Sequence, residues 1–430
     1  MTETDLGEAA AVADGPRRGR VARVLDSPAL DVLRIHDYRW YWLATLLYFT
    51  VFGAQRFAFV LLVLEISDSA GLGGVTGFAL GIPAFFITVP AGVWADSHDR
   101  RRLVMFTNAC ASVVLLTVAV VIWAGAASVW TALVLALAAG TAGATAQPAL
   151  MAIVPAVVPP SRLMSAIVLR TVGQNFAMVV GNVVGGVAIA LLGFGGAFAV
   201  QGALGVIAIL GFARLRPMPA AHARQGAPSG MREQAREGLA YVLGDPALRA
   251  LVVLLVISGV FMIGPVFVLV PEIARTQLGV GPFLNSMLFA AMSVGMLLMS
   301  AFLASVPNLR RKGYWFLLNM LLPGPYLMLM AWSDWYAFSA VMMFLWGIGG
   351  GVFMNLNMTL MQANTPDRLQ GRVMSISGLS IAGLVPLGSL LAGGGAEVIG
   401  AAGYLGLSGA VLSVAAVLTF ARAQALRDME

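Results

Sequence analysis

The chain has 430 residues, of which 59% are hydrophobic and only 11% are charged, and its mean hydropathy is +0.87. A soluble domain carries roughly 25% charged residues, so this composition cannot supply the polar surface of a water-soluble protein of this size. The net charge is +6, but no basic segment is interleaved with aromatic residues, so we expect no nucleic-acid partner. The surface is therefore expected to face a lipid bilayer.

Residues 1–39 are polar and carry arginines, and they lack the apolar core and the cleavage site of a signal peptide. Beyond them, twelve stretches have the roughly 20 mostly apolar residues that a membrane-spanning helix needs. They run near residues 40–64, 73–95, 103–124, 129–155, 164–191, 194–213, 250–273, 281–305, 314–332, 335–362, 371–395 and 400–421. Very short turns must join the spans at 191–194 and at 332–335.

The placement of the basic residues predicts the orientation of these spans. Of the 26 lysines and arginines, 23 fall in the two tails or in the loops that follow even-numbered spans. The positive-inside rule places such segments in the cytoplasm. The loops after odd-numbered spans hold one basic residue and several acids, namely Arg275 with Glu65, Asp68, Glu272, Asp334 and Glu397. We expect a multi-pass protein of the cell membrane with both termini cytoplasmic.

The long segment 214–249 divides the spans into two groups of six. Its first part is rich in Pro, Ala and Gly and predicts a flexible linker, and Met231–Leu243 predicts an amphipathic helix on the membrane surface. The expected organisation is a cytoplasmic N-terminal tail (1–39), an N-terminal bundle (40–213), a cytoplasmic linker (214–249), a C-terminal bundle (250–421) and a cytoplasmic C-terminal tail (422–430).

The two halves also resemble each other in sequence. Three pairs of short segments recur at offsets of 206, 207 and 210 residues, namely PSRL (160–163) with PDRL (366–369), VVGNVVGG (179–186) with PLGSLLAG (386–393), and RRR (100–102) with RRK (310–312). Three matches nearly in register indicate a duplicated six-helix unit, and many transporters build two bundles around a midplane site in this way. We therefore predict an all-α membrane protein with two six-helix bundles.

The segment AGVWADSHDRRRLV (91–104) places six ionisable residues between two long apolar runs. Within it, Gly92-x-x-x-Asp96 followed by Asp99-Arg100-Arg101 resembles the loop signature of the major facilitator superfamily. The segments 236–252 and 367–379 are similar to the branch that includes the enterobactin exporter and macrolide efflux proteins. The resemblance covers residues 34–421.

This resemblance implies that the loop is a cytoplasmic latch. Gly92 would let a neighbouring helix approach closely, and Asp96 would face the positive N-terminus of a neighbour, for which helix 11 is the family's candidate. Arg100 and Arg101 would pair with acids or with helix carboxyl ends. Ser97 replaces the arginine that usually follows the aspartate, which removes one partner. The alternative is that these arginines only anchor the loop on the cytoplasmic side.

A second motif of the family, which marks antiporting exporters, is partly present in the fifth span. The stretch Ala177-x-x-x-Gly181-Asn182-x-x-Gly185-Gly186 keeps three of the motif's glycines, whereas Ala177 replaces the first glycine and Asn182 the proline. Small residues four apart would let helices 5 and 8 slide closely, and ordinary tight packing is the alternative. The arginine that the family associates with proton coupling is missing from helix 4.

Arg56 is the most informative polar residue because it lies well inside the first span, where insertion costs roughly 2.5–3.5 kcal/mol. It shares one broad helical face with Tyr48, Phe52, Gln55 and Phe59. We predict that Arg56 binds an anionic group of the substrate or pairs with an acid during cycling. Outward snorkelling and a structural ion pair are the alternatives.

Other polar residues in the spans give weaker predictions. Gln147, Asn355 and Asn357 are candidates for the cavity, although such amides also hold helices together. Arg170 lies near the start of its span and is expected to snorkel to the cytoplasm. No acid lies at mid-membrane, so a proton carrier would be one of the acids near the span ends, namely Glu65, Asp96 or Glu272. For Glu272, pairing with Arg275 is the alternative.

The sequence favours a secondary active transporter that exports a small organic compound, such as a drug, a siderophore or a natural product, with protons as the candidate coupling ion. A lipid or lysolipid flippase and a solute importer are the alternatives on the same fold. An enzyme is disfavoured because no catalytic constellation, phosphate-binding loop or metal-ligand spacing is present. A receptor would need a signalling domain, for which only the linker is available. We expect a monomer without cofactor or metal.

Overall fold

The computed structural model describes residues 31–218, 231–306, 309–427 and 429, and these residues form helices and no strands. The first half contains η1 (Val32–Arg34), α4 (His36–Ser67), α5 (Ala70–Gly81), α6 (Pro83–Ser97), α7 (Arg100–Trp123), α8 (Val129–Val157), η2 (Pro160–Arg162) and α9 (Leu163–Phe212). The second contains α10 (Met231–Gly244), α11 (Pro246–Ser258), the π-helical turn η3 (Gly259–Ile263), α12 (Gly264–Thr276), α13 (Pro282–Ser305), α14 (Lys312–Met320), α15 (Pro323–Ala331), α16 (Tyr336–Ala363), α17 (Asp367–Ile399), α18 (Ala401–Arg422) and α19 (Gln424–Arg427).

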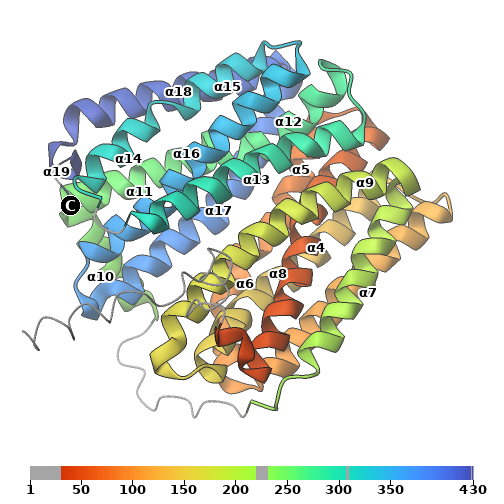
Figure 1. The fold of residues 1–430 in the computed structure, drawn as a ribbon. Helices are drawn as coiled ribbons and strands as arrows, with labels where there is room; N and C mark the ends of the chain where they lie inside the picture. Colours follow the sequence, from red (N-terminus) through yellow and green to blue (C-terminus); the bar gives the residue numbers. More distant parts are fainter. Residues whose placement is uncertain (1–30, 219–230, 307–308, 428, 430) are drawn as a thin grey trace, which may run out of the picture.

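Within the described residues, eleven helical segments are long and apolar enough to cross a membrane. The longest, Pro160–Phe212, is two spans, because Gly193 leaves the helical conformation with φ +68° and α9 turns back on itself (Figure 1). Proline or a π-helical turn interrupts three other spans without ending them, at α5/α6, α11/α12 and α14/α15. The prediction of twelve spans is confirmed, with boundaries within four residues of those expected.

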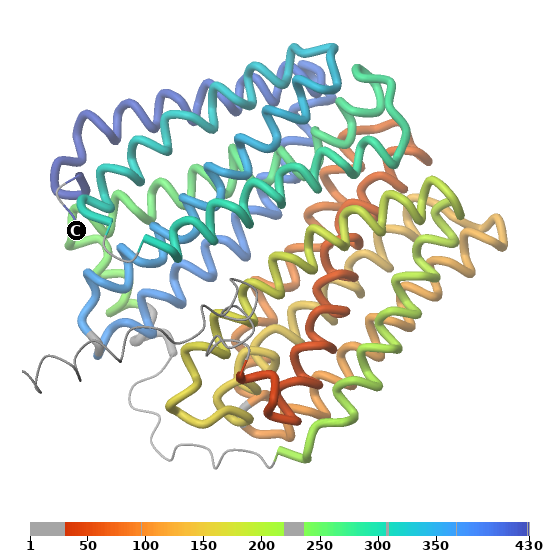
Figure 2. The backbone as a smooth tube through the Cα atoms, in the orientation of Figure 1, coloured from red at the N-terminus to blue at the C-terminus, as the bar shows by residue number. Residues whose placement is uncertain are grey.

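The spans pack as two bundles of six, one built from α4–α9 and the other from α11–α18 (Figures 1 and 2). The predicted amphipathic helix forms as α10, and it packs on α17 and α11 of the second bundle. Glu237 of α10 pairs with Arg372 of α17, and the Tyr241 hydroxyl lies 3.4 Å from the Asn364 carbonyl oxygen. The Pro-, Ala- and Gly-rich part of the linker lies largely outside the described residues.

The two ends of the molecule differ in charge. We call the end that holds Arg34, Arg100–Arg102, Arg162 and Arg372 the arginine-rich end. We call the opposite end, which holds Asp68, Glu272, Arg275 and Glu397, the far end.

At the far end, α5 of the first bundle and α17 of the second pack backbone against backbone. A Cβ atom added to Gly74 would lie 2.6 Å from the Ser389 carbonyl oxygen and 2.8 Å from the Gly393 Cα atom. Only glycine fits such an approach, and small residues are how helices pack closely in lipid. The far end is therefore closed.

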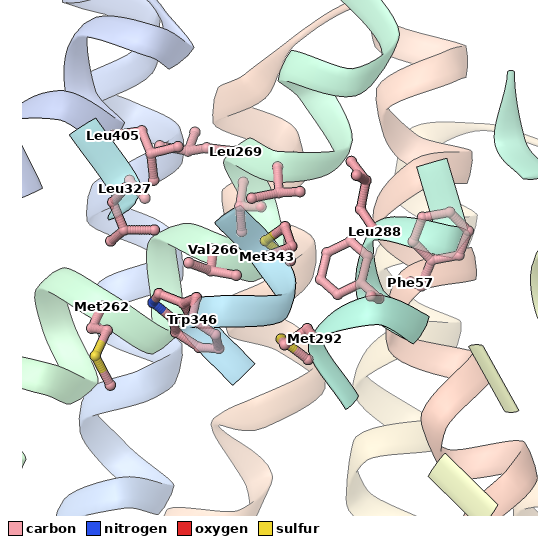
Figure 3. Close-up of a cluster of buried hydrophobic side chains, with 14 of the residues drawn as sticks. Phe57, Met262, Val266, Leu269, Leu288, Met292, Leu327, Met343, Trp346 and Leu405 are labelled. Carbon is pink, nitrogen blue, oxygen red and sulfur yellow. The ribbon is translucent and has the colours of Figure 1, made fainter. Parts of the chain in front are cut away.

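Aromatic side chains extend this contact between the bundles toward their middle. Phe57 of α4 points into the hydrophobic cluster of the second bundle, beside Leu288 and Met292 (Figure 3). Its ring centroid lies 5.7 Å from that of Phe289, which stacks in turn on Phe267 at 5.8 Å. One apolar core thus runs through both bundles.

Toward the arginine-rich end the same pair of spans separates. A Cβ atom added to Gly92 of α6 or to Gly378 of α17 would meet nothing within 4 Å. The close helix approach expected at Gly92 is therefore absent from this conformation, because the bundles meet at the other end.

Replacing Gly74 with valine should force α5 and α17 apart at the far end. The readout is a reporter cysteine at Val268, which is fully buried between the bundles beside Gly73 and Gly77, in a chain with Cys110 replaced by alanine. We expect Gly74→Val to make this cysteine react with a membrane-impermeant maleimide.

Gly378→Val, which adds the same side chain to α17 in open space, serves as the control and should leave the reporter unreactive. Equal reactivity of the Val268→Cys reporter in the two variants would contradict the role given to the close packing of α5 on α17 at Gly74.

Candidate substrate cavity and its surroundings

A cavity of about 280 Å³ lies between the bundles, walled by α4, α5, α6, α7 and α8 on one side and by α17 on the other. Its polar groups come from Tyr48, Gln55, Arg56, Asn108 and Gln147. Gly81 and Pro386 line it where they abut each other, so the closed far end bounds the cavity.

Four of the six residues predicted for a substrate cavity line this one, namely Tyr48, Gln55, Arg56 and Gln147. Asn355 and Asn357 do not line it. The Asn355 amide donates to the Ser300 hydroxyl of α13 at 3.0 Å, so it joins two helices of its own bundle. Asn357 is only 4% exposed, inside the second bundle.

Asn108 lines the cavity but was not predicted from the sequence. Its amide donates to the Gly205 carbonyl oxygen of α9 at 2.8 Å. The signal that could have found it is the same as for Gln147: an uncharged amide inside an otherwise apolar span.

The Arg56 guanidinium belongs to the first bundle, and its contacts come from the second. Nη2 donates to the Ser389 hydroxyl at 3.3 Å, and Cζ lies 4.2 Å from the centroid of the Phe267 ring. A cation over an aromatic face is attracted to it, and the attraction grows when water is excluded. Among the residues that the structure describes, Arg56 forms no ion pair, and its buried Nε has no hydrogen-bond partner. Arg56 thus does not snorkel outward, and it has no structural counter-ion among the described side chains.

The glycine motif of the fifth span faces two different helices. Gly181 and Gly185 pack against Thr50 and Ala54 of α4, in the same bundle. Asn182 and Gly186 face α13 of the other bundle, where the Asn182 amide donates to the Ser293 hydroxyl at 3.1 Å. The expectation that the motif packs helix 5 (the first half of α9) on helix 8 (α13) is therefore met by one face only. Residues four apart share a face, and Asn182 and Gly186 lie on a different face from Gly181 and Gly185.

The charged loop after α6 ties its own bundle together. The Asp99 carboxylate caps α7 by accepting from the backbone N–H of Arg101 at 2.9 Å. Arg100 donates to the carbonyl oxygens of Ala95 at 3.3 Å and Ala152 at 3.0 Å. Arg101 donates at 2.7 Å to the Ala213 carbonyl oxygen at the end of α9, where the helix dipole favours a cation. The backbone of Asp96 lies in α6, and its side chain is outside the described part of the chain.

Two sets of polar contacts bridge the bundles at the far end. Arg275 of α12 donates to the Asp68 carboxylate at 2.6 Å and to Glu272 of its own helix at 3.4 Å. Glu397 of α17 accepts from the Ser69 hydroxyl at 2.6 Å and from the Gly71 N–H at 2.8 Å, at the N-terminus of α5. The sequence indicated the pairing of Glu272 with Arg275 but not the partners across the bundles, and Glu65 is exposed.

Removing the Glu397 carboxylate should loosen the far end, because it leaves the Gly71 N–H and the Ser69 hydroxyl without their acceptor across the bundles. We expect Glu397→Ala to raise the reactivity of the Val268→Cys reporter. Glu65→Ala removes an exposed acid at the same end and should leave the reporter unchanged. If both substitutions act alike, net charge and not the capping contact controls closure.

The predicted snorkelling of Arg170 is wrong. Arg170 is 8% exposed within the first bundle, and its Nε donates to the Tyr41 hydroxyl at 2.9 Å. That hydroxyl donates in turn to the Leu150 carbonyl oxygen at 2.9 Å. The chain of contacts links α9, α4 and α8, and no charge periodicity in the sequence signals it.

Tyr41→Phe should therefore destabilise the first bundle by about 1–3 kcal/mol, because it leaves the buried Nε of Arg170 without its acceptor and removes the bond to the Leu150 carbonyl oxygen. The thermal unfolding midpoint of the purified protein in detergent measures this. Tyr48→Phe removes a hydroxyl that lies 3.4 Å from its acceptor, the Gly143 carbonyl oxygen, and should lower the midpoint less. A larger loss for Tyr48→Phe would contradict this assignment.

The two bundles with a cavity between them define a multi-pass membrane protein with the architecture of a solute transporter. Residues 41–389 match the Major Facilitator Superfamily, and the chain belongs to that family. No curated protein matches the chain. Within the described residues, no group of three or more His, Cys, Asp or Glu side chains could hold a metal ion.

Solved structures share the fold over nearly their whole length. The nucleoside transporter NupG is 12% identical, with a TM-score of 0.67 and coverage of 91% of this chain and 99% of that one. A bacterial homologue of the human lysosomal transporter Spinster, inward-facing and occupied, is 17% identical, with a TM-score of 0.66 and coverage of 91% and 98%. The human organic anion transporter MFSD10 (TETRAN) is 15% identical, with a TM-score of 0.64 and coverage of 91% and 100%. Identities this low show the fold alone.

Proposed function

We propose that the protein is a secondary active transporter that exports a small organic compound bearing an anionic group. The observation that carries this proposal is the Arg56 guanidinium, which lines the cavity between the bundles without a counter-ion among the described residues. Binding an anion there would satisfy the unused Nε and neutralise the charge in a site of low dielectric.

The positive-inside rule supports the orientation of this transporter. With the arginine-rich end in the cytoplasm of a cell-membrane protein, the conformation described here is inward-facing, and the substrate enters from the cytoplasmic side. The far end is then the extracellular gate. Export is also supported by the resemblance of 236–252 and 367–379 to the enterobactin and macrolide efflux branch and by the remaining glycines of the antiporter motif.

Arg56 would couple the occupied cavity to the gate. Its present partners, Ser389 and Phe267, lie in α17 and α12 of the second bundle. Ser389 also packs against Gly74 and Gly77, where α5 and α17 approach each other closely. A substrate anion competes with Ser389 for the same guanidinium. Binding therefore weakens a contact that holds the bundles together at the far end, which favours the outward-facing conformation.

The other polar groups of the cavity would orient the substrate. The amides of Gln55 and Gln147 and the hydroxyl of Tyr48 can donate and accept hydrogen bonds, and Phe52 supplies an aromatic wall.

If protons drive the cycle, the candidate carriers are Glu65, Asp96 and Glu272. Of these, Glu272 is engaged by Arg275 in this conformation, so its protonation would change the charge beside the arginine that bridges to Asp68. We propose that the protein works as a monomer.

The test is the accumulation of a panel of labelled amphiphiles, drugs and siderophores in cells with and without the protein, repeated with a protonophore. We expect lower accumulation of anionic compounds in cells that contain the native chain. Arg56→Gln should reduce this export about 10–100-fold, as expected for the loss of one charged hydrogen-bonding partner, and Arg56→Lys should retain part of it.

Arg34→Gln removes an exposed arginine and is the control for net charge. Normal membrane levels of Arg56→Gln with unchanged export would contradict the role of Arg56. Accumulation that rises with the native chain would indicate an importer, and transfer of labelled lysolipid between leaflets would indicate a flippase.

A further inference from the structure

A second hollow, of about 530 Å³, lies between α6, α7 and α8 and shares no lining residue with the cavity between the bundles. We call it the α6–α8 groove. Its wall is apolar, because the hydroxyls of its three threonines each donate to a backbone carbonyl oxygen one turn earlier in the same helix, from Thr107, Thr141 and Thr145. Phe106 and Val134 are 67% and 65% exposed at its rim. The groove therefore opens outward from the bundle.

The length of the groove matches one leaflet of a bilayer. It extends from Leu103 to Val114 along α7 and from Val134 to Thr145 along α8. At 1.5 Å per residue, each of these distances is about 16 Å. The hydrocarbon core of a bilayer is about 30 Å thick, so the groove spans about half of it, beginning at the arginine-rich end.

The charges at the mouth of the groove favour an anion. Arg102 directly precedes Leu103 and lies one turn before Phe106, so it shares the face of α7 that borders the groove. Its side chain is 86% exposed, and its ion pair with Asp99 is 3.9 Å long. Trp94 lines the same end of the groove, and tryptophan is typical of the level of the lipid headgroups.

We propose that the α6–α8 groove binds one acyl chain of an anionic phospholipid from the leaflet at the arginine-rich end, with the headgroup phosphate on Arg102. The apolar wall accepts the chain, and the exposed guanidinium supplies the preference for negative charge. The bound lipid bridges α6 to α7 and α8, and the charged segment 96–102 joins α6 to α7. This site stands apart from the proposed function, because it involves neither Arg56 nor the cavity between the bundles.

The experiment uses a reporter that the chain already contains. Cys110 is its single cysteine and lines the groove, so a bound acyl chain must shield it. The full-length protein is purified in detergent, and the rate of alkylation by N-ethylmaleimide is measured during titration with dioleoyl phosphatidylglycerol or dioleoyl phosphatidylcholine. We expect half-maximal protection at about fivefold lower concentration of phosphatidylglycerol, as one arginine near the headgroup provides.

Variants separate binding in the groove from general shielding of the protein by lipid. Arg102→Gln should give the two lipids equal potency, and Arg102→Lys should restore the difference. Arg56→Gln should leave protection unchanged. A chain carrying Val120→Cys and Cys110→Ala places the thiol on an exposed position of α7 outside the groove, where the two lipids should not differ. The proposal is overturned if the native protein is protected equally by both lipids, by neither, or still selectively after Arg102→Gln.

Discussion

The contact between α5 and α17 through Gly74 and Gly393 is the constraint on which the rest of the structure depends. In a bilayer, apolar surface gives helices no reason to associate, so close backbone packing and polar contacts must hold the two bundles together. Here the close approach of the glycines lies at the far end, where Arg275 and Glu397 add charged bridges beside them. Closing this end separates the bundles at the other, and the cavity between them follows from that geometry.

Arg56 lies where this contact meets the cavity. A guanidinium in the middle of a span is expensive, and in the described part of the chain its contacts are a serine hydroxyl and an aromatic face of the opposite bundle. The same side chain can therefore contribute to closure when the cavity is empty and recognise an anion when it is filled. A lysine would keep the charge but lose the planar guanidinium, whose several N–H groups let one side chain serve both the contact with the opposite bundle and the anion.

The spans and their ends could be predicted from the sequence because each needs a long apolar stretch between polar loops. The cavity positions on α4 could be predicted as well, since Tyr48, Gln55 and Arg56 share one helical face. What could not be predicted depends on which helices become neighbours. Asn355 binds Ser300 and Arg170 binds Tyr41 because bundle packing brings those pairs together, and Glu397 reaches α5 across more than 300 residues of chain. No periodicity within one span contains that information.

The measurement that tests this account most directly is a pair of distances between spin labels, one pair at each end of the protein in lipid nanodiscs. Labels at Ala126 and Asp334 report on the far end, and labels at Ser161 and Gly371 report on the arginine-rich end. Arg275→Ala removes the bridge to Asp68, and we expect it to lengthen the first distance and shorten the second. A longer far-end distance with the other unchanged would show that the two ends move independently, and it would contradict alternating access built on this contact.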